Sequence, residues 1–91
     1  MTTDYFRRQW SESRGDEHAS WGSATYYFEV GDDGWPIRQI EIYEAGPTLR
    51  YGPEHAEDRY GQLSQTQIRA EDWQPWAISE AEFSQAWQTR D

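Results

Sequence analysis

The chain's 91 residues fit one domain spanning 1–91, carry a formal net charge of −9 and include no cysteine. The missing cysteine excludes a disulfide framework and a thiolate metal site, and the negative charge opposes binding to nucleic-acid phosphates and to anionic membranes. Because aliphatic side chains are scarce, the six Trp, six Tyr and three Phe residues must supply most of the hydrophobic core.

The first predicted element is a β-strand over residues 4–10, which places Phe6, Arg8 and Trp10 on one face of a sheet. A short helix is the alternative, because Phe6 and Trp10 are also spaced as helical neighbours. Residues 11–22 are polar and contain glycines, so we expect a loop there.

The clearest strands follow as a meander of three. Residues 25–30 (TYYFEV) are rich in β-forming side chains, and residues 31–34 (GDDG) have the Asp-Gly chemistry of a tight turn. Residues 36–44 predict the second strand of the meander. Its first residue is Pro36, and a strand tolerates a proline at its beginning, where the missing N–H does no harm. Residues 45–47 predict another turn, and residues 49–51 predict a short third strand.

Two segments after the meander have weaker patterns. Residues 52–61 predict a charged loop. Residues 62–68 predict a further strand that carries Leu63. The sequence leaves the structure of the whole stretch 62–75 open.

The best local signal is that of a C-terminal helix. Ser79 and Glu82 have the spacing of a capping box, in which each side chain satisfies a free backbone N–H, and Ile78 and Phe83 have the spacing of a hydrophobic staple. The helix is marginal alone, so it must pack on the sheet through its apolar stripe, which consists of Phe83, Ala86 and Trp87. The predicted fold is therefore α+β, an antiparallel sheet of about four to five strands with a C-terminal helix packed on one face.

Several of these features recur together in known proteins. They are an aromatic first strand, an Arg followed by a Glu in a strand (Arg38 and Glu41), a turn glycine (Gly46) and a closing IS-x-x-EF-x-x-W helix, here Ile78, Ser79, Glu82, Phe83 and Trp87. Over nearly its whole length the chain resembles a family of small bacterial proteins known only as a domain of unknown function. The resemblance implies a bacterial source and the same fold, and it implies no activity.

The candidate catalytic and metal-binding groups have simpler explanations. His55 lies among Glu54, Glu57 and Asp58, but a single imidazole without ligand spacing favours a solvated loop over a metal site. Residues 32–34 (DDG) look like a calcium loop without its downstream ligands. No serine lies in a glycine-flanked elbow, and no glycine-rich phosphate loop precedes a helix. We therefore expect neither enzyme activity nor a metal or cofactor.

Arg38 is the first candidate for binding. Strand alternation places it with Ile40 and Ile42, on the face that we expect the helix to cover. A charge there needs a partner or must reach the edge of the sheet. Arg38 is therefore either a residue of the core margin, where it pairs with a carboxylate or snorkels to solvent, or an anchor for an acidic ligand group.

Aromatic side chains are the second candidate. We expect Tyr27 and Tyr43 on the sheet face opposite Phe28 and Ile42. If the helix covers only one face, these tyrosines are partly exposed together with Trp35 and Tyr51, as in a protein-binding hot spot. The alternatives are that the aromatic residues pack under the long loops or form a homodimer interface.

The first functional hypothesis is a small acidic protein-binding module, most concretely an immunity or inhibitor protein that neutralises a basic bacterial toxin. Acidic side chains at Glu54, Glu57 and Asp58 would steer the basic partner. The aromatic residues Tyr27, Tyr43 and Trp35 would anchor it.

Two other hypotheses belong to different classes. The first is a small-molecule binding domain, which would grip its ligand between aromatic rings and Arg38. The second is a structural subunit of a larger assembly, whose sign would be self-association. The first ten residues lack the apolar run of a signal peptide, and no stretch is apolar enough to span a membrane, so we expect a cytoplasmic protein.

Overall fold

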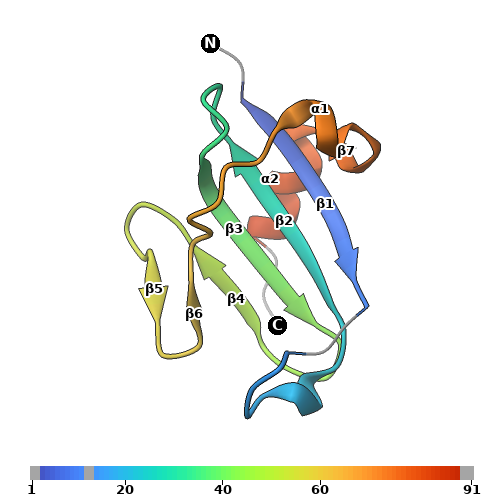
Figure 1. The fold of residues 1–91 in the computed structure, drawn as a ribbon, viewed down its shortest axis with the longest axis vertical. Helices are drawn as coiled ribbons and strands as arrows, with labels where there is room; N and C mark the ends of the chain where they lie inside the picture. The colour runs from blue at the N-terminus through green and yellow to red at the C-terminus, as the bar shows by residue number, and fades with distance from the viewer. Residues whose placement is uncertain (1–2, 12–13, 89–91) are drawn as a thin grey trace.

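A five-stranded antiparallel sheet forms the centre of the computed structural model, which describes residues 3–11 and 14–88 (Figure 1). The strands lie in the order β4-β3-β2-β1-β7, so that β1 to β4 form a meander and β7 adds to the free edge of β1. Their bounds are β1 Asp4–Trp10, β2 Ala24–Val30, β3 Pro36–Tyr43, β4 Thr48–Tyr51 and β7 Ala77–Ile78. The predicted α+β fold is confirmed, and the first four strands lie where the sequence predicts them.

The tight turn between β2 and β3 forms as its composition predicts. The Asp33 carboxylate accepts a hydrogen bond from the backbone N–H of Trp35 at 3.1 Å, and the N–H of Gly34 donates to the carbonyl of Gly31 at 2.9 Å. Gly34 has a φ of 87°, in the left-handed region that favours glycine. The turn is therefore fixed by its own side chain and backbone, and it holds Trp35 in a defined place.

One face of the sheet packs on helix α2 (Glu80–Gln88), which lies behind the sheet in Figure 1. The Ser79 hydroxyl accepts a hydrogen bond from the N–H of Glu82 at 3.1 Å, which is the N-cap contact that the capping-box spacing predicts. The Glu82 carboxylate itself lies 3.7 Å from the Arg7 guanidinium. Phe83 is fully buried, and its ring centroid lies 5.5 Å from that of Tyr5. The predicted helix and its packing are confirmed.

The other face is also covered, by chain with little regular structure. Its elements are η1 (Ala19–Trp21), β5 (Glu57–Asp58), β6 (Gly61–Gln62), α1 (Ala70–Trp73) and η2 (Gln74–Trp76). Figure 1 shows the chain from β6 to α1 crossing in front of β3 and β2, on the side away from α2. The short strands β5 and β6 pair only with each other.

The predicted strand over 62–68 is wrong beyond Gln62. Only Gly61 and Gln62 are in a strand, and the chain after them runs across the sheet instead of pairing along its edge. The backbone N–H of Ile68 donates to the carbonyl of Gly34 at 2.7 Å, and the N–H of Ser64 donates to the Gln39 side-chain oxygen at 2.7 Å. These bonds to the sheet and to its turn replace a strand ladder, and they seat Ile68 in the core.

Two clusters of buried side chains lie between the sheet and this cover. One consists of Phe6, Phe28, Val30 and Ile68, and the other consists of Ala24, Tyr43, Leu49 and Tyr51. Between them, the buried Glu41 carboxylate accepts hydrogen bonds from the side chains of Gln39 and Tyr43. The buried oxygens of Glu41 thus have hydrogen-bond partners, as buried polar atoms require.

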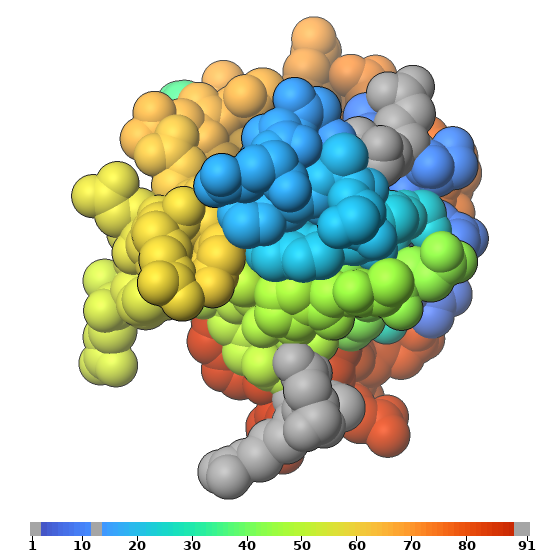
Figure 2. Space-filling model, turned by 90° about the horizontal axis from the view of Figure 1, so that it is seen from below, coloured from blue at the N-terminus to red at the C-terminus, as the bar shows by residue number. Residues whose placement is uncertain are grey.

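The segment 14–24 closes the end of this layer. Figure 2 shows it in blue to cyan, packed beside the yellow segment that contains Tyr60. An Arg14 side-chain N–H donates to the carbonyl of Tyr60, and the Trp21 ring centroid lies 5.5 Å from that of Tyr60. Trp21 also lies directly on Gly46, where an added Cβ would be 2.5 Å from the indole Cγ. The turn after β3 therefore needs a glycine because an aromatic ring occupies the space beside it.

Replacing Gly46 by alanine tests this contact. We expect Gly46→Ala to lower the free energy of unfolding by about 1–3 kcal/mol, because the new methyl group must displace the Trp21 ring. Gly15→Ala is the matched control, since an added Cβ there meets nothing within 4 Å. Urea unfolding followed by tryptophan fluorescence measures both variants. Equal unfolding midpoints for the two variants would contradict the contact.

Candidate functional site

The aromatic residues predicted for binding do not share one exposed face. Cross-strand partners lie on the same face of a sheet, and Tyr27 pairs with Ile40 whereas Tyr43 pairs with Ala24. Tyr27 therefore lies on the α2 side and Tyr43 on the opposite side. The prediction that both lie on one face, opposite Phe28 and Ile42, is wrong. The register pairs odd-numbered residues of β2 with even-numbered residues of β3, so two odd-numbered residues on these strands lie on opposite faces.

Tyr43 and Tyr51 are core residues. Their exposed fractions are 5% and 0%, because the cover formed by segments 14–24 and 57–76 lies over them, so the predicted exposure of these tyrosines is wrong. The Tyr43 hydroxyl donates to Glu41 and the Tyr51 hydroxyl donates to Asp58. Burial, together with these bonds to carboxylates, raises the pKa of both phenols well above the usual value. Both rings hold the fold together.

The three carboxylates predicted to steer a partner have different surroundings. Glu54 and Glu57 are exposed. Asp58 accepts hydrogen bonds from the backbone N–H groups of Tyr60 and Gly61 as well as from the Tyr51 hydroxyl. Burial opposes ionisation of Asp58, but these hydrogen bonds outweigh it and lower its pKa. Asp58 is therefore part of the β5–β6 turn, and the other two carboxylates remain available to a partner.

Arg38 forms the carboxylate pair that was one of its two expected roles. Its Nε lies 2.6 Å from Glu29 Oε1, and its Nη2 lies 3.0 Å from Glu29 Oε2, which is a bidentate pair. The guanidinium also lies 4.9 Å from the ring centroids of Phe83 and Trp87, so it links the sheet to α2. The hydrogen bond from Arg38 lowers the pKa of Glu29, and burial with the bond to Glu80 raises that of Tyr5 to about 12.

The β2–β3 turn carries the most exposed large apolar side chains of this end of the sheet. Trp35 is 46% exposed and Ile37 is 37% exposed. The carboxyl groups of Asp32 and Asp33 lie beside them, because all four residues line or border one hollow of about 260 Å³. We call these four residues the turn surface. Of the predicted binding residues, Trp35 alone belongs to it.

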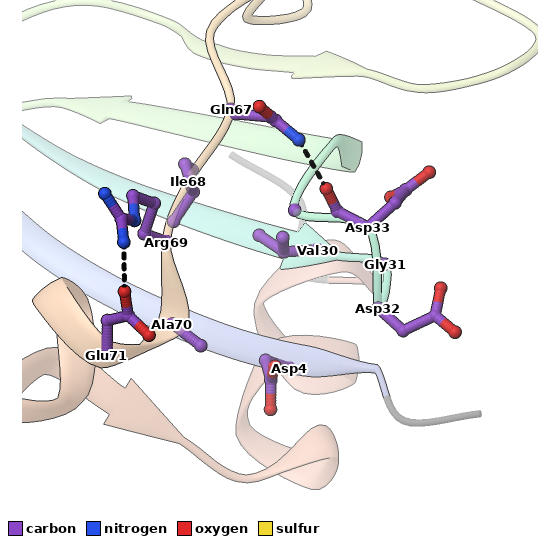
Figure 3. Close-up of a pocket in the computed structure, with 11 residues that line it drawn as sticks. Asp4, Val30, Gly31, Asp32, Asp33, Gln67, Ile68, Arg69, Ala70 and Glu71 are labelled. Atoms are coloured by element: carbon purple, nitrogen blue, oxygen red, sulfur yellow. Dashed lines mark hydrogen bonds and ion pairs between the residues drawn. The ribbon is translucent and has the colours of Figure 1, made fainter.

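A second hollow, of about 540 Å³, lies on the other side of the turn, against the chain from Gln67 to Glu71 (Figure 3). Asp4, Asp32 and Asp33 line it. Figure 3 shows that Asp32 points out from the turn and that Glu71 is directed at Arg69, which bonds it. The carboxylates therefore add negative charge to the turn surface without converging on a common point.

No metal centre emerges in the part of the chain that the structure describes. Residues 3–11 and 14–88 contain no group of three or more His, Asp or Glu side chains arranged to hold a metal ion. His55 lies 3.3 Å from Asp58, and its ring stacks on Tyr51 at 6.0 Å between centroids. Within the same residues, no helix is long and apolar enough to cross a membrane.

Ile37 and the position of Asp32 were missed from the sequence. A β-bulge interrupts the alternation of β3 at Ile37, because Glu29 pairs with Arg38 whereas Val30 pairs with Pro36. Alternation along the strand therefore does not place the Ile37 side chain. The cover reaches the beginning of β3, where Pro36 is buried and Ile68 bonds to Gly34, but it leaves Ile37 37% exposed. No local pattern in the sequence reports where the cover ends.

Comparisons with protein-family models, with curated protein sequences and with solved structures found no significant match. The resemblance to a bacterial domain of unknown function therefore stays a prediction that depends on its motif residues. The candidate site has to be judged on its own geometry.

The Arg38–Glu29 pair predicts a dependence of stability on pH. Because the pKa of Glu29 is lower in the folded protein than its ordinary value of 4.5, the pair stabilises the fold above about pH 4.5 and loses this effect as the pH falls. We expect Glu29→Gln to be less stable than the wild type at neutral pH, since Arg38 loses its partner, and to lose less stability on acidification. Chemical unfolding at a series of pH values measures both effects.

The exposed Glu54 offers a matched control for this experiment. Glu54→Gln removes the same charge without breaking the pair, so its profile should follow that of the wild type. An acid profile of Glu29→Gln that is as steep as that of the wild type would rule out the pair as a source of acid sensitivity.

Proposed function

We propose that this protein is an acidic protein-binding module that recognises a basic partner protein through the turn surface, defined by Asp32, Asp33, Trp35 and Ile37. The observation that carries the proposal is the exposure of Trp35, which is 46% although the chain uses its aromatic residues mainly as core. Tryptophan is enriched among the few residues that supply most of the binding energy at protein interfaces.

The position of Trp35 suits an anchor. Its backbone N–H is bonded to Asp33, and its carbonyl accepts a hydrogen bond from Gly31 at 3.1 Å. Because these bonds fix the backbone at Trp35, binding need not order the turn, so more of the contact energy becomes affinity. Ile37 beside it extends the apolar contact area.

The charges around Trp35 favour a basic partner. Asp32 and Asp33 line the same hollow as Trp35, Asp4 lines the neighbouring hollow, and the whole chain has a net charge of −9. Such a field raises the rate of association with a basic protein and opposes association with an acidic one. A second copy of this chain is equally acidic, so the same field disfavours a homodimer through this surface.

The most specific form of the proposal is an inhibitor or immunity protein that neutralises a basic toxin. That role needs affinity, charge complementarity and a rigid surface, and it needs no chemistry from the inhibitor. The exposed carboxylates Glu54 and Glu57 would add to the long-range attraction in this role.

The proposal is tested by capture of proteins from the native host on the immobilised wild type, on Trp35→Ala and on Trp10→Ala. Trp10 is the matched control, because it is 44% exposed at the other end of the sheet. We expect a basic protein that wild type and Trp10→Ala retain and that Trp35→Ala binds about thirtyfold more weakly or worse, as for a hot-spot residue. For that protein, Asp32→Asn should slow association and weaken its salt dependence.

The outcome that would reject the turn surface is equally specific. If Trp35→Ala retains every basic protein that the wild type captures with unchanged affinity, Trp35 is not the anchor. If Asp32→Asn leaves the association rate unchanged at low salt, the carboxylates of the turn do not steer.

A further inference from the structure

A second hollow with different chemistry lies on the covered face, between β1, β2 and α1. It has a volume of about 340 Å³, and its lining is aromatic apart from one arginine: Arg8, Trp10, Tyr26, Phe28 and Trp73. We call it the Arg8 pocket. Residues of the sheet and of the cover line this pocket together: Trp10 is the last residue of strand β1, and Trp73 is the last residue of helix α1 in the cover. Its size is at the lower end of the range for small-molecule sites.

Tryptophan rings hold the Arg8 guanidinium in place. Its central carbon lies 4.1 Å from the ring centroid of Trp76 and 5.1 Å from those of Trp10 and Trp73. All three distances are within the range of cation–π attraction. The rings surround the guanidinium, and they contribute no acceptor for its N–H groups.

Arg8 differs in this respect from the other arginines that the structure describes. Four of them, Arg7, Arg14, Arg38 and Arg69, form ion pairs with carboxylates. Within residues 3–11 and 14–88, the Arg8 guanidinium forms neither an ion pair nor a hydrogen bond, although the chain has an excess of acidic side chains. A guanidinium has five N–H donors in a planar fork that matches a carboxylate. Arg8 therefore presents an unused anion-binding group at an aromatic pocket.

The lining of the pocket selects the rest of the ligand. Indole, phenyl and phenol rings favour a flat apolar body, which can stack on them or meet their edges. The positive charge of Arg8 would repel a cationic ligand. A neutral polar ligand would form no ion pair with the guanidinium. The complementary ligand is a flat apolar molecule with one negative group.

We propose that the Arg8 pocket binds a small aromatic carboxylate, with the ring system between Trp10, Phe28 and Trp73 and the carboxylate on the Arg8 guanidinium. The pocket lies at the opposite end of β1 and β2 from Trp35, because Trp10 pairs with Ala24 at one end and Asp4 pairs with Val30 beside the turn at the other. The site is therefore independent of the turn surface and does not depend on the proposed protein partner.

The test uses 1-naphthoate as the probe and its neutral analogue 1-naphthamide as the matched control ligand. The two have the same ring system, so the difference between them reports the contribution of the negative charge. We expect 1-naphthoate to bind the full chain saturably and to shift the indole N–H signals of Trp10 and Trp73 in ¹H–¹⁵N NMR spectra. The amide should bind about ten- to a hundredfold more weakly, as for a lost charge-assisted hydrogen bond.

Variants of two neighbouring arginines then assign the charge. Arg8→Gln should reduce the affinity for 1-naphthoate to that for the amide, whereas Arg7→Gln should not change it, since Arg7 lies on the other face of the same strand. Arg8→Lys keeps the charge without the planar fork and should give an intermediate affinity.

Three results would overturn the proposal. They are equal affinities of the wild type for the acid and the amide, signal shifts confined to tryptophans other than Trp10, Trp73 and Trp76, and no saturation by 1-naphthoate. The ligand comparison uses the wild type alone, so it decides the question even if Arg8→Gln does not fold. A failure here leaves the turn surface untouched, because none of these measurements involves Trp35.

Discussion

The structure depends on how a sheet with two apolar faces is covered when the chain supplies only one long helix. Helix α2 covers the face of Arg38, and the other face is covered by irregular chain that is attached to the sheet through hydrogen bonds of its backbone and side chains. The bond from Ile68 to Gly34 joins the cover to the β2–β3 turn, and the bond from Ser64 to Gln39 joins it to β3. Large aromatic rings suit such a cover, because each removes much apolar area from water without needing a regular backbone.

The extent of this cover decides which residues can bind anything. It buries Tyr43 and Tyr51, leaves Trp35 and Ile37 partly exposed, and leaves an open aromatic pocket where Trp73 faces Trp10. The two candidate sites thus lie at opposite ends of the sheet and have opposite chemistry. One is an apolar anchor among carboxylates and suits a basic protein. The other is a guanidinium among aromatic rings, without a carboxylate partner in the described part of the chain, and it suits an organic anion.

The features that could be predicted from the sequence have local causes. Strand composition, the Asp-Gly turn and the Ser79 cap each depend on residues close together in the chain, and they form as predicted. Alternation along one strand was also sufficient to place Arg38 under the helix. Pairing register and long-range contacts were out of reach: the sequence does not tell which residue of β3 lies opposite Tyr27, nor that Trp73 packs near Arg8. The binding face was mispredicted because the cover over 62–76 has no periodic pattern.

The central claim is that irregular chain covers the second face as tightly as a regular element would, and Ile68 tests it most directly. Ile68 is 4% exposed in a segment without helix or strand, whereas Ile37 is 37% exposed at the beginning of β3. The free energy of unfolding in urea should fall by about 2–5 kcal/mol in Ile68→Ala, as in a packed core. In Ile37→Ala it should fall by at most about 1 kcal/mol. Equal, small losses in both variants would contradict the claim.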